Sequence, residues 1–248
     1  MSSRSEVEGI ATELRQKSVS TSPVHLNSIA SRMGVSAISY SEIPEEGRLI
    51  RDAVGRVFIE LRSDRPTHRR RFTLAHELVH LHLDHGKHRS AVIHSRVSAQ
   101  RHVEEERLCD SVAAALLIPA EVVEDLTSEL PIALEGLKRL ASGQGCSLSA
   151  AAARITEVTG VKLLVAKLNF GGDRNVPTIE WASRRPKGMR GSIRCVTYRR
   201  ARGGGYDCIR LEFGQVQFDA KCELDSNGAE TIALFSMMKR VRTRVGAS

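Results

Sequence analysis

Two histidines, His76 and His80, stand four residues apart and enclose a glutamate, Glu77, in the sequence HELVH. On a helix this spacing places both imidazoles on one face, about one turn apart, where they can bind the same metal ion. The glutamate would lie beside that ion and could take a proton from a water molecule held there. The pattern therefore predicts a zinc-dependent hydrolase, with a peptidase as the leading interpretation and Glu77 as the catalytic base.

The surroundings of this motif favour a metal over chance. Apolar residues on nearly every side predict a buried helix: Phe72, Leu74, Ala75, Leu78, Val79, Leu81 and Leu83. Buried histidines next to a buried glutamate need partners, because unpaired ionisable groups are costly in a core. A metal ion would meet that need. The alternative is that the HExxH pattern arose by chance on a solvent-exposed helix face and binds no metal.

A third protein ligand is expected, since catalytic zinc usually has three and keeps one position open for water. The extended pattern HExxHxxGxxH does not supply it, because Leu83 and Gly86 occupy its glycine and last histidine positions. A cysteine upstream of the motif, as in deformylase-type sites, does not supply it either, because the first cysteine is Cys109. Polar residues just after the motif stay open as alternatives: His82, Asp84, His85 and His88.

A second predicted helix, residues 104–119, offers a better third ligand. It is rich in alanine and leucine and ends at a proline. Glu106 and Asp110 share one face, so Glu106 could bind the metal while Asp110 accepts the N–H of a metal-bound histidine. Glu104 and Glu105 compete with Glu106, and an acidic helix start, favoured by the helix dipole, would explain all three.

The two segments RFTLAHELVH and EERLCDSVAAALLIP resemble the ImmA/IrrE family of bacterial zinc metallopeptidases, whose shared text runs roughly RFTxAHELGH and then ExxA(N/D)xFAxxLLMP. The similarity covers both helices and extends more weakly over residues 20–160. The resemblance implies that His76, His80 and Glu106 hold one Zn²⁺ per chain and that Glu77 is the base.

Four positions differ from the shared family sequence without removing a predicted ligand. Val79 replaces the usual glycine and Cys109 the usual alanine, while Val112 replaces phenylalanine and Ile118 replaces methionine. Cys109 could itself bind a metal, but a buried small hydrophobic residue is the favoured interpretation.

Composition indicates a cytoplasmic protein without a membrane partner. The start MSSRSEVEGI has no apolar signal segment, and no apolar run approaches the length of a membrane span. The five cysteines, an odd number without a CxxC pair, indicate reduced thiols.

The positive charge is concentrated in the last third of the chain. Residues 1–160 contain 20 Lys and Arg against 21 Asp and Glu, whereas residues 161–248 contain 17 against 8, so the net charge of +8 arises entirely there. Two basic clusters stand out: Arg184, Arg185, Lys187, Arg190, Arg194, Arg199, Arg200 and Arg202, and then Lys239, Arg240, Arg242 and Arg244. Such clusters can attract nucleic acid or an acidic protein surface, and solvated loops explain them equally well.

Patterning along the chain predicts an α+β protein in three parts. Residues 1–125 are expected to form a zincin-like metallopeptidase domain, with helices packed on a small β-sheet. Residues 126–160 form a helical segment that resembles a helix-turn-helix. Residues 161–248 form a small, basic, β-rich C-terminal domain, a candidate for binding a signal or a partner.

The expected helices span residues 3–17, 23–35, 71–83, 104–119, 120–129, 132–142 and 147–159. The expected strands span residues 37–40, 48–62 with a turn at 52–55, 162–168, 178–183, 193–198, 206–213 and 216–221. Within the helix-turn-helix-like text, residues 149–153 offer few side chains that could read bases, so packing is their expected role. We expect residues 57–61 to form an edge strand that binds the substrate backbone, with closure of the core sheet as the alternative role.

These features predict a zinc-dependent endopeptidase. Zinc would lower the pKa of its water towards about 7, and Glu77 would take the proton and pass it to the leaving amine. The donor that stabilises the oxyanion stays open among Tyr40, His102 and Arg71. The resemblance implies a repressor-type protein substrate, cleaved to release stress-response or mobile-element genes. The alternative is a regulator that binds DNA or a repressor and has a non-proteolytic zinc site.

Overall fold

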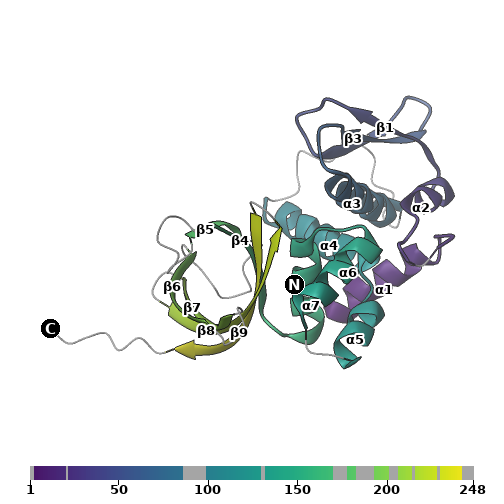
Figure 1. Ribbon diagram of the computed structural model, residues 1–248. Coiled ribbons are helices and arrows are strands. Elements are labelled where there is room, and N and C mark those ends of the chain that lie inside the picture. Colours follow the sequence, from purple (N-terminus) through teal and green to yellow (C-terminus); the bar gives the residue numbers. More distant parts are fainter. Residues whose placement is uncertain are drawn as a thin grey trace. The chain divides into compact units, whose positions relative to one another are not determined.

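The computed structural model describes residues 3–20, 22–85, 99–129, 132–169, 178–182, 193–200, 206–213, 216–227 and 230–241 (Figure 1). The helices of this part are α1 (Arg4–Arg15), α2 (Leu26–Arg32), α3 (Thr67–His85), α4 (Ala99–Leu117), α5 (Ala120–Glu129), α6 (Leu134–Gln144) and α7 (Leu148–Thr159). The strands are β1 (Val35–Ser41), β2 (Gly47–Arg51), β3 (Val57–Arg62), β4 (Leu163–Asn169), β5 (Thr178–Ala182), β6 (Ile193–Arg200), β7 (Tyr206–Phe213), β8 (Val216–Asn227) and β9 (Glu230–Val241). The α+β class predicted from the sequence is confirmed.

The chain divides into two compact units. The first comprises Met1–Val122 with Ala141–Ser147, and the second comprises Val123–Leu140 with Leu148–Ser248. The predicted domain boundaries at residues 125 and 160 stay a prediction. None of the helices in the described part of the chain is both long enough and apolar enough to cross a membrane.

The sheet of the first unit has the strand order β1-β3-β2. β3 pairs in parallel with β1 and antiparallel with β2, so it is the central strand. The expectation that residues 57–61 form a substrate-binding edge strand is therefore wrong, and their alternative role, closure of the core sheet, is the one observed. Val57, Ile59 and Leu61 alternate with less buried residues and face the core. The edge next to α3 belongs to β2.

α3 lies against the core face of this sheet and contacts both β2 and β3 (Figure 1). It begins directly after Pro66, whose carbonyl accepts the backbone N–H groups of Arg69 and Arg70. Its apolar residues Ala75, Leu78, Val79 and Leu81 are fully buried, as their pattern predicted. The sheet covers one side of α3 and α4 covers another. The motif histidines lie on the side that faces α4.

α4 packs on α3 and, through another face, on α1. The residues of its buried faces have no solvent exposure: Cys109, Val112, Ala113, Ala115 and Leu116. Small residues on this helix permit close approach, which is what brings its acidic positions within reach of the histidines on α3.

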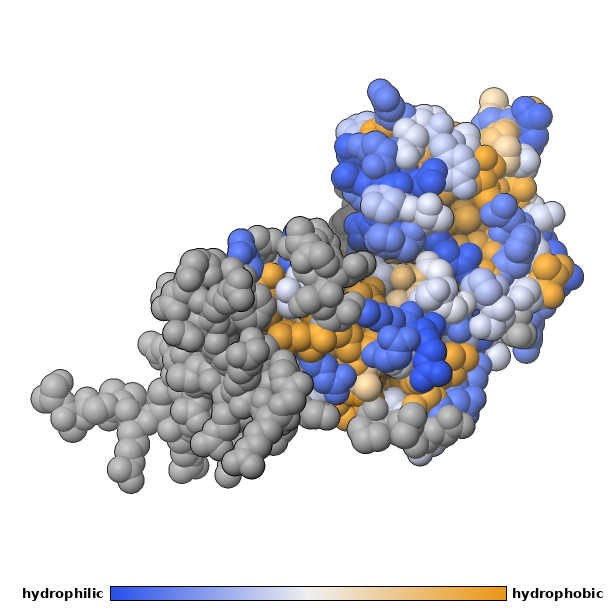
Figure 2. Space-filling view, viewed as in Figure 1, coloured by the Kyte–Doolittle hydropathy of each residue, from blue (hydrophilic) through white to orange (hydrophobic). Residues whose placement is uncertain are grey.

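The solvent side of the first unit is dominated by charged pairs. Arg48 contacts Glu60 across the β2–β3 pair at 2.6 Å, and Arg56 contacts Asp52 in the connecting turn, also at 2.6 Å. Figure 2 shows one face, on which hydrophilic and apolar areas lie side by side over the coloured part of the surface.

The second unit contains an antiparallel sheet with the order β5-β4-β9-β8-β7-β6. Its core includes Leu164, Ala166, Leu168, Leu211, Ala220, Cys222, Ala233 and Phe235. α7 packs on β4, and Ala151 and Ala152 of its alanine run are buried, consistent with the packing role expected for this segment. The side chains of both basic clusters lie outside the described residues.

Candidate metal centre

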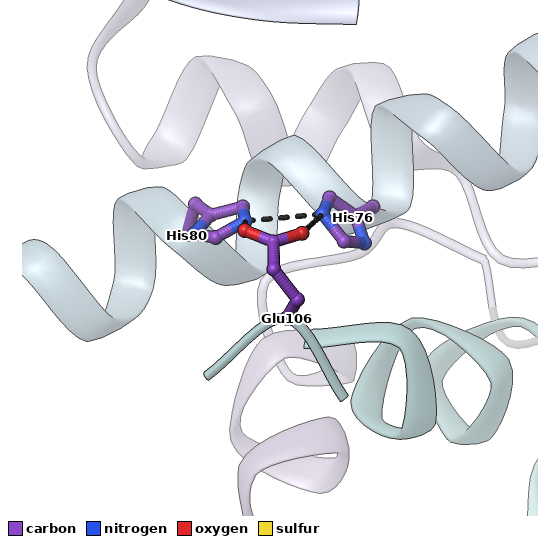
Figure 3. Close-up of side chains that lie close together, drawn as sticks. All are labelled: His76, His80 and Glu106. Carbon is purple, nitrogen blue, oxygen red and sulfur yellow. Dashed lines mark hydrogen bonds and ion pairs between the residues drawn. The ribbon is translucent and has the colours of Figure 1, made fainter. Parts of the chain in front are cut away.

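His76 and His80 are one turn apart on α3 and turn their rings toward the same point (Figure 3). Their Nε2 atoms are 3.0 Å apart, and the ring centroids are 4.7 Å apart with an interplanar angle of 65°. Two imidazole nitrogens at this separation repel each other unless a proton or a cation lies between them. The pair is therefore arranged to share a positive charge.

Glu106 of α4 completes the group. Its Oε2 lies 3.3 Å from Nε2 of His76, and its Oε1 lies 3.2 Å from Nε2 of His80 (Figure 3). The three ligand atoms are all within 4.8 Å of one another. Glu104 and Glu105, the competing glutamates, are not members of this group.

These donors suit zinc. Zn–N and Zn–O bonds of about 2.0–2.2 Å in a tetrahedral site separate the donors by about 3.3–3.6 Å. The two Nε2 atoms are 3.0 Å apart, and the Glu106 oxygens lie 3.2 and 3.3 Å from them, so a small outward shift of the side chains would admit the ion. Two imidazoles and one carboxylate also form a donor set of catalytic zinc sites, in which the fourth position is open.

α4 also contacts the second nitrogen of each histidine ring. Oδ1 of Asp110 lies 3.2 Å from Nδ1 of His76, and Sγ of Cys109 lies 3.6 Å from Nδ1 of His80. Cys109 is thus beside the ring nitrogen that faces away from the ligand group. Burial, reinforced by the nearby carboxylates, raises the pKa of its thiol well above the usual range, which keeps it neutral.

The charges around the two histidines differ. Burial alone would lower the pKa of His76, but Asp110, Glu77 and Glu106 outweigh it, and the pKa lies above its usual value. Burial lowers the pKa of His80, and the positive charge of His76 lowers it further. A metal ion would have to displace the proton from His76, because only neutral imidazole can be a ligand.

Glu77 is buried beside this group and has 9% of its surface exposed. Burial raises its pKa to about 7, while His76 opposes the rise and Glu106 adds to it. Gly47 at the start of β2 lies against its carboxylate, since a Cβ atom there would be 3.3 Å from Oε1. Sequence reasoning missed this contact, although a glycine at a strand start near the motif helix is a signal of close backbone approach.

Two of the three oxyanion candidates, Arg71 and Tyr40, have described side chains, and each has a partner outside the ligand group. Arg71 donates to the carbonyl of Val24, on the side of α3 away from the ligand group. Tyr40 is half exposed on β1 and lies under the guanidinium of Arg70. His102 belongs to α4, but its side chain is outside the described residues.

Of the alternative ligands after the motif, His82 and Asp84 have described side chains, and neither is a member of the group. Nε2 of His82 lies 3.4 Å from Oε2 of Glu13 on α1. Asp84 belongs to the last turn of α3, the side chain of His85 lies outside the described residues, and so does all of His88.

Comparison with known proteins agrees with this geometry. A family model described as the IrrE N-terminal-like domain, of peptidase family M78, matches residues 20–156, more than half of the chain. No curated protein matches. A solved structure of a Mycobacterium tuberculosis transcriptional regulator is similar in fold, with a TM-score of 0.50 and 12% identity, covering 94% of this chain and 76% of that one. Because the matched residues include both helices of the ligand group, the chain belongs to the ImmA/IrrE family of metallopeptidases.

Proposed function

We propose that the chain is a zinc-dependent endopeptidase of the cytoplasm that cleaves a repressor-type protein. The observation that carries this proposal is the buried carboxylate of Glu77 beside the converging donors of His76, His80 and Glu106. A structural metal site has no use for a buried base next to it, whereas hydrolysis requires one.

The residues divide the chemistry among them. His76, His80 and Glu106 would hold one zinc ion, which when bound supplies the Lewis acidity that activates water and polarises a peptide carbonyl. Glu77 accepts the proton of the attacking water on its carboxylate and passes it to the amine that leaves. Asp110 accepts the Nδ1–H of His76 and so fixes the tautomer in which Nε2 is the ligand.

β2 is the strand best placed to hold an extended substrate. It lies at the edge of the sheet, and its first residue is so near the proposed base that a Cβ atom added to Gly47 would lie 3.3 Å from Oε1 of Glu77. Backbone hydrogen bonds join Arg62 to Glu46 and Asp52 to Arg56 at the two ends of the β2–β3 hairpin. Hydrogen-bonded and non-hydrogen-bonded residue pairs alternate along an antiparallel ladder. The N–H and C=O groups that point away from β3 are therefore those of Gly47, Leu49 and Arg51. A peptide added along these groups would pass beside Glu77.

A repressor as substrate is inferred from kinship. The family resemblance implies cleavage of a repressor that controls stress-response or mobile-element genes, and the similar solved structure is named a transcriptional regulator. A candidate substrate is the product of a repressor-like gene next to the gene of this chain.

The decisive experiment compares the wild-type chain with Glu77→Gln. Each is loaded with zinc and incubated with the candidate repressor, and the products are identified by mass spectrometry. We expect Glu77→Gln to keep the metal and to lose cleavage, because glutamine cannot accept the proton, while the surface variant Glu104→Gln cleaves like wild type. Equal cleavage by Glu77→Gln would refute the mechanism.

The basic excess of residues 161–248 supports a second candidate, a regulator that binds DNA or a repressor without proteolysis. It predicts a salt-dependent shift of duplex DNA by the full chain, with affinity falling steeply between low and physiological salt. A catalytically competent wild type that shows no shift at low salt would exclude the DNA-binding form.

A further inference from the structure

We infer that Cys109 is a positioning residue that holds the ring of His80 for metal binding. The inference rests on the metal centre proposed above. Sγ of Cys109 lies 3.6 Å from Nδ1 of His80, while Nε2 of the same ring is directed at Glu106 and His76. When Nε2 is the ligand, Nδ1 must bear the hydrogen, and the thiol sulfur is the acceptor beside it.

α4 then serves both histidines through two adjacent residues. Asp110 meets Nδ1 of His76 at 3.2 Å, and Cys109 meets Nδ1 of His80. Glu106, one turn earlier, contacts the Nε2 atoms of both rings. Each histidine is therefore held at both nitrogens, and one helix determines both orientations.

A thiol suits the His80 side because of its surroundings. Cys109 is fully buried and packs beside Val112 and Ala113, which are also fully buried. A carboxylate in its place would put another negative charge in the core next to Glu106 and Asp110. Sulfur supplies an acceptor without that charge, although it is a weaker acceptor than a carboxylate.

The test measures zinc affinity of the full chain by competition with a chromophoric chelator. We expect Cys109→Ala to bind zinc about tenfold more weakly, at the lower end of the effect of losing such a partner. Cys109→Ser keeps a small hydrogen-bonding group and recovers most of the affinity. Cys222→Ala removes another buried thiol, in β8, and leaves the zinc affinity unchanged.

Thermal unfolding of the metal-free proteins separates packing from positioning. A packing role lowers the stability of the metal-free Cys109→Ala chain without changing its zinc affinity, and that outcome overturns the inference. Equal losses of affinity in Cys109→Ala and Cys109→Ser overturn it as well. If the wild-type chain binds no zinc, the proposed metal centre is refuted. If it binds zinc and Cys109→Ala binds zinc equally well, only the positioning role of Cys109 is refuted.

The ring itself gives an independent signature if Cys109→Ala does not fold. The nitrogen–proton correlation spectrum of zinc-loaded protein reports which nitrogen of His80 bears the hydrogen. We expect the Nδ1–H signal in wild type, with a different chemical shift in Cys109→Ser. Identical shifts in the two proteins would show that the sulfur makes no contact that matters.

Discussion

Gly47 of β2 faces Glu77 of α3 so closely that a side chain on residue 47 would meet the carboxylate of the proposed catalytic base. A Cβ atom on Gly47 would lie 3.3 Å from Oε1 of Glu77 and only 2.5 Å from Cγ2 of Thr73. The second distance is shorter than real side-chain contacts allow. The strand can therefore approach the helix this closely because residue 47 has no side chain.

We expect Gly47→Ala to destabilise the protein by about 1–3 kcal/mol, the usual cost of forcing an extra carbon into a packed region. Urea unfolding of the metal-free chain measures the change. Gly9→Ala is the matched control, because Gly9 is exposed on α1 and its added carbon meets nothing within 4 Å. That control should be neutral or stabilising by up to about 1 kcal/mol. A Gly47→Ala chain as stable as wild type would show that the contact is not tight.

The proposed base should respond to the same substitution. The added carbon pushes on the carboxylate of Glu77, so we expect Gly47→Ala to cleave the candidate repressor more slowly under conditions where the chain remains folded. Single-turnover rates, normalised to the folded fraction, measure the effect. Unchanged rates would indicate that Glu77 works independently of β2.

Local periodicity predicted the helices and the pairs of side chains that share a helix face, while the family resemblance selected Glu106 as the third member of the group. His76 and His80, and likewise Glu106 and Asp110, are separated by one helical turn, so each pair had to share a face. Sequence spacing therefore predicted which side chains share a face of one helix. The meeting of Glu106 with the two histidines depends in addition on the packing of α4 on α3, which spacing alone does not set.

Strand order could not be predicted in the same way. The parallel pairing of β1 with β3 joins segments that are not consecutive strands, and nothing local in residues 57–61 distinguishes a central strand from an edge strand. β9 was missed because its leucine, methionine and alanine residues do not favour a strand, and pairing with β4 and β8 overrides that preference. The close approach of Gly47 to Glu77 likewise depends on non-local contacts, because β2 must pair with β3 and α3 must pack on both strands.

Glu106 should be the indispensable carboxylate of α4. We expect Glu106→Ala to reduce zinc to well below one ion per chain after dialysis, because only two protein ligands remain. Glu104→Ala, two residues away on the exposed side, should retain full occupancy. Metal analysis of the purified variants decides between them, and the reverse pattern would transfer the ligand role to Glu104.

Asp110 should matter less than a ligand and more than a surface residue. Loss of a carboxylate that orients a metal-bound histidine typically costs 10- to 100-fold in metal affinity. We expect that loss in Asp110→Ala and a smaller one in Asp110→Asn, whose amide oxygen can still accept from His76. Chelator competition measures both. Equal affinity of Asp110→Ala and wild type would mean that His76 is oriented by its packing alone.

Removal of the metal should lower stability by mass action. A ligand at about 100 times its dissociation constant stabilises the folded state by about 2.7 kcal/mol, so zinc should raise the thermal midpoint of unfolding and a chelator should reverse the rise. Glu106→Ala, which lacks the carboxylate ligand, serves as control and should show little response to either. A wild-type midpoint that does not depend on zinc would count against a bound ion at this group.

Acid should weaken the attachment of β2 to the start of α3. Glu46, which precedes β2, contacts Arg65 at 2.8 Å and Arg69 at 3.0 Å. Burial is the largest single influence and raises its pKa, but the hydrogen bonds and charges of the two arginines together lower the pKa below the usual 4.5. A carboxylate with a depressed pKa stabilises the folded state above its unfolded pKa, and this contribution disappears as the pH falls through the folded value.

Glu46→Gln should therefore reduce the unfolding free energy at neutral pH by about 0.2–1 kcal/mol, a small effect because the groups are partly exposed and screened. The difference from wild type should be constant down to about pH 4.5 and vanish at lower pH, and added salt should shrink it. Glu45→Gln, which removes the neighbouring exposed carboxylate, corrects for the change in net charge. Urea unfolding of the metal-free proteins between pH 2.5 and about pH 7 would measure the effect. A difference that grew on acidification would mean that the carboxylate of Glu46 is stabilised in its protonated form instead.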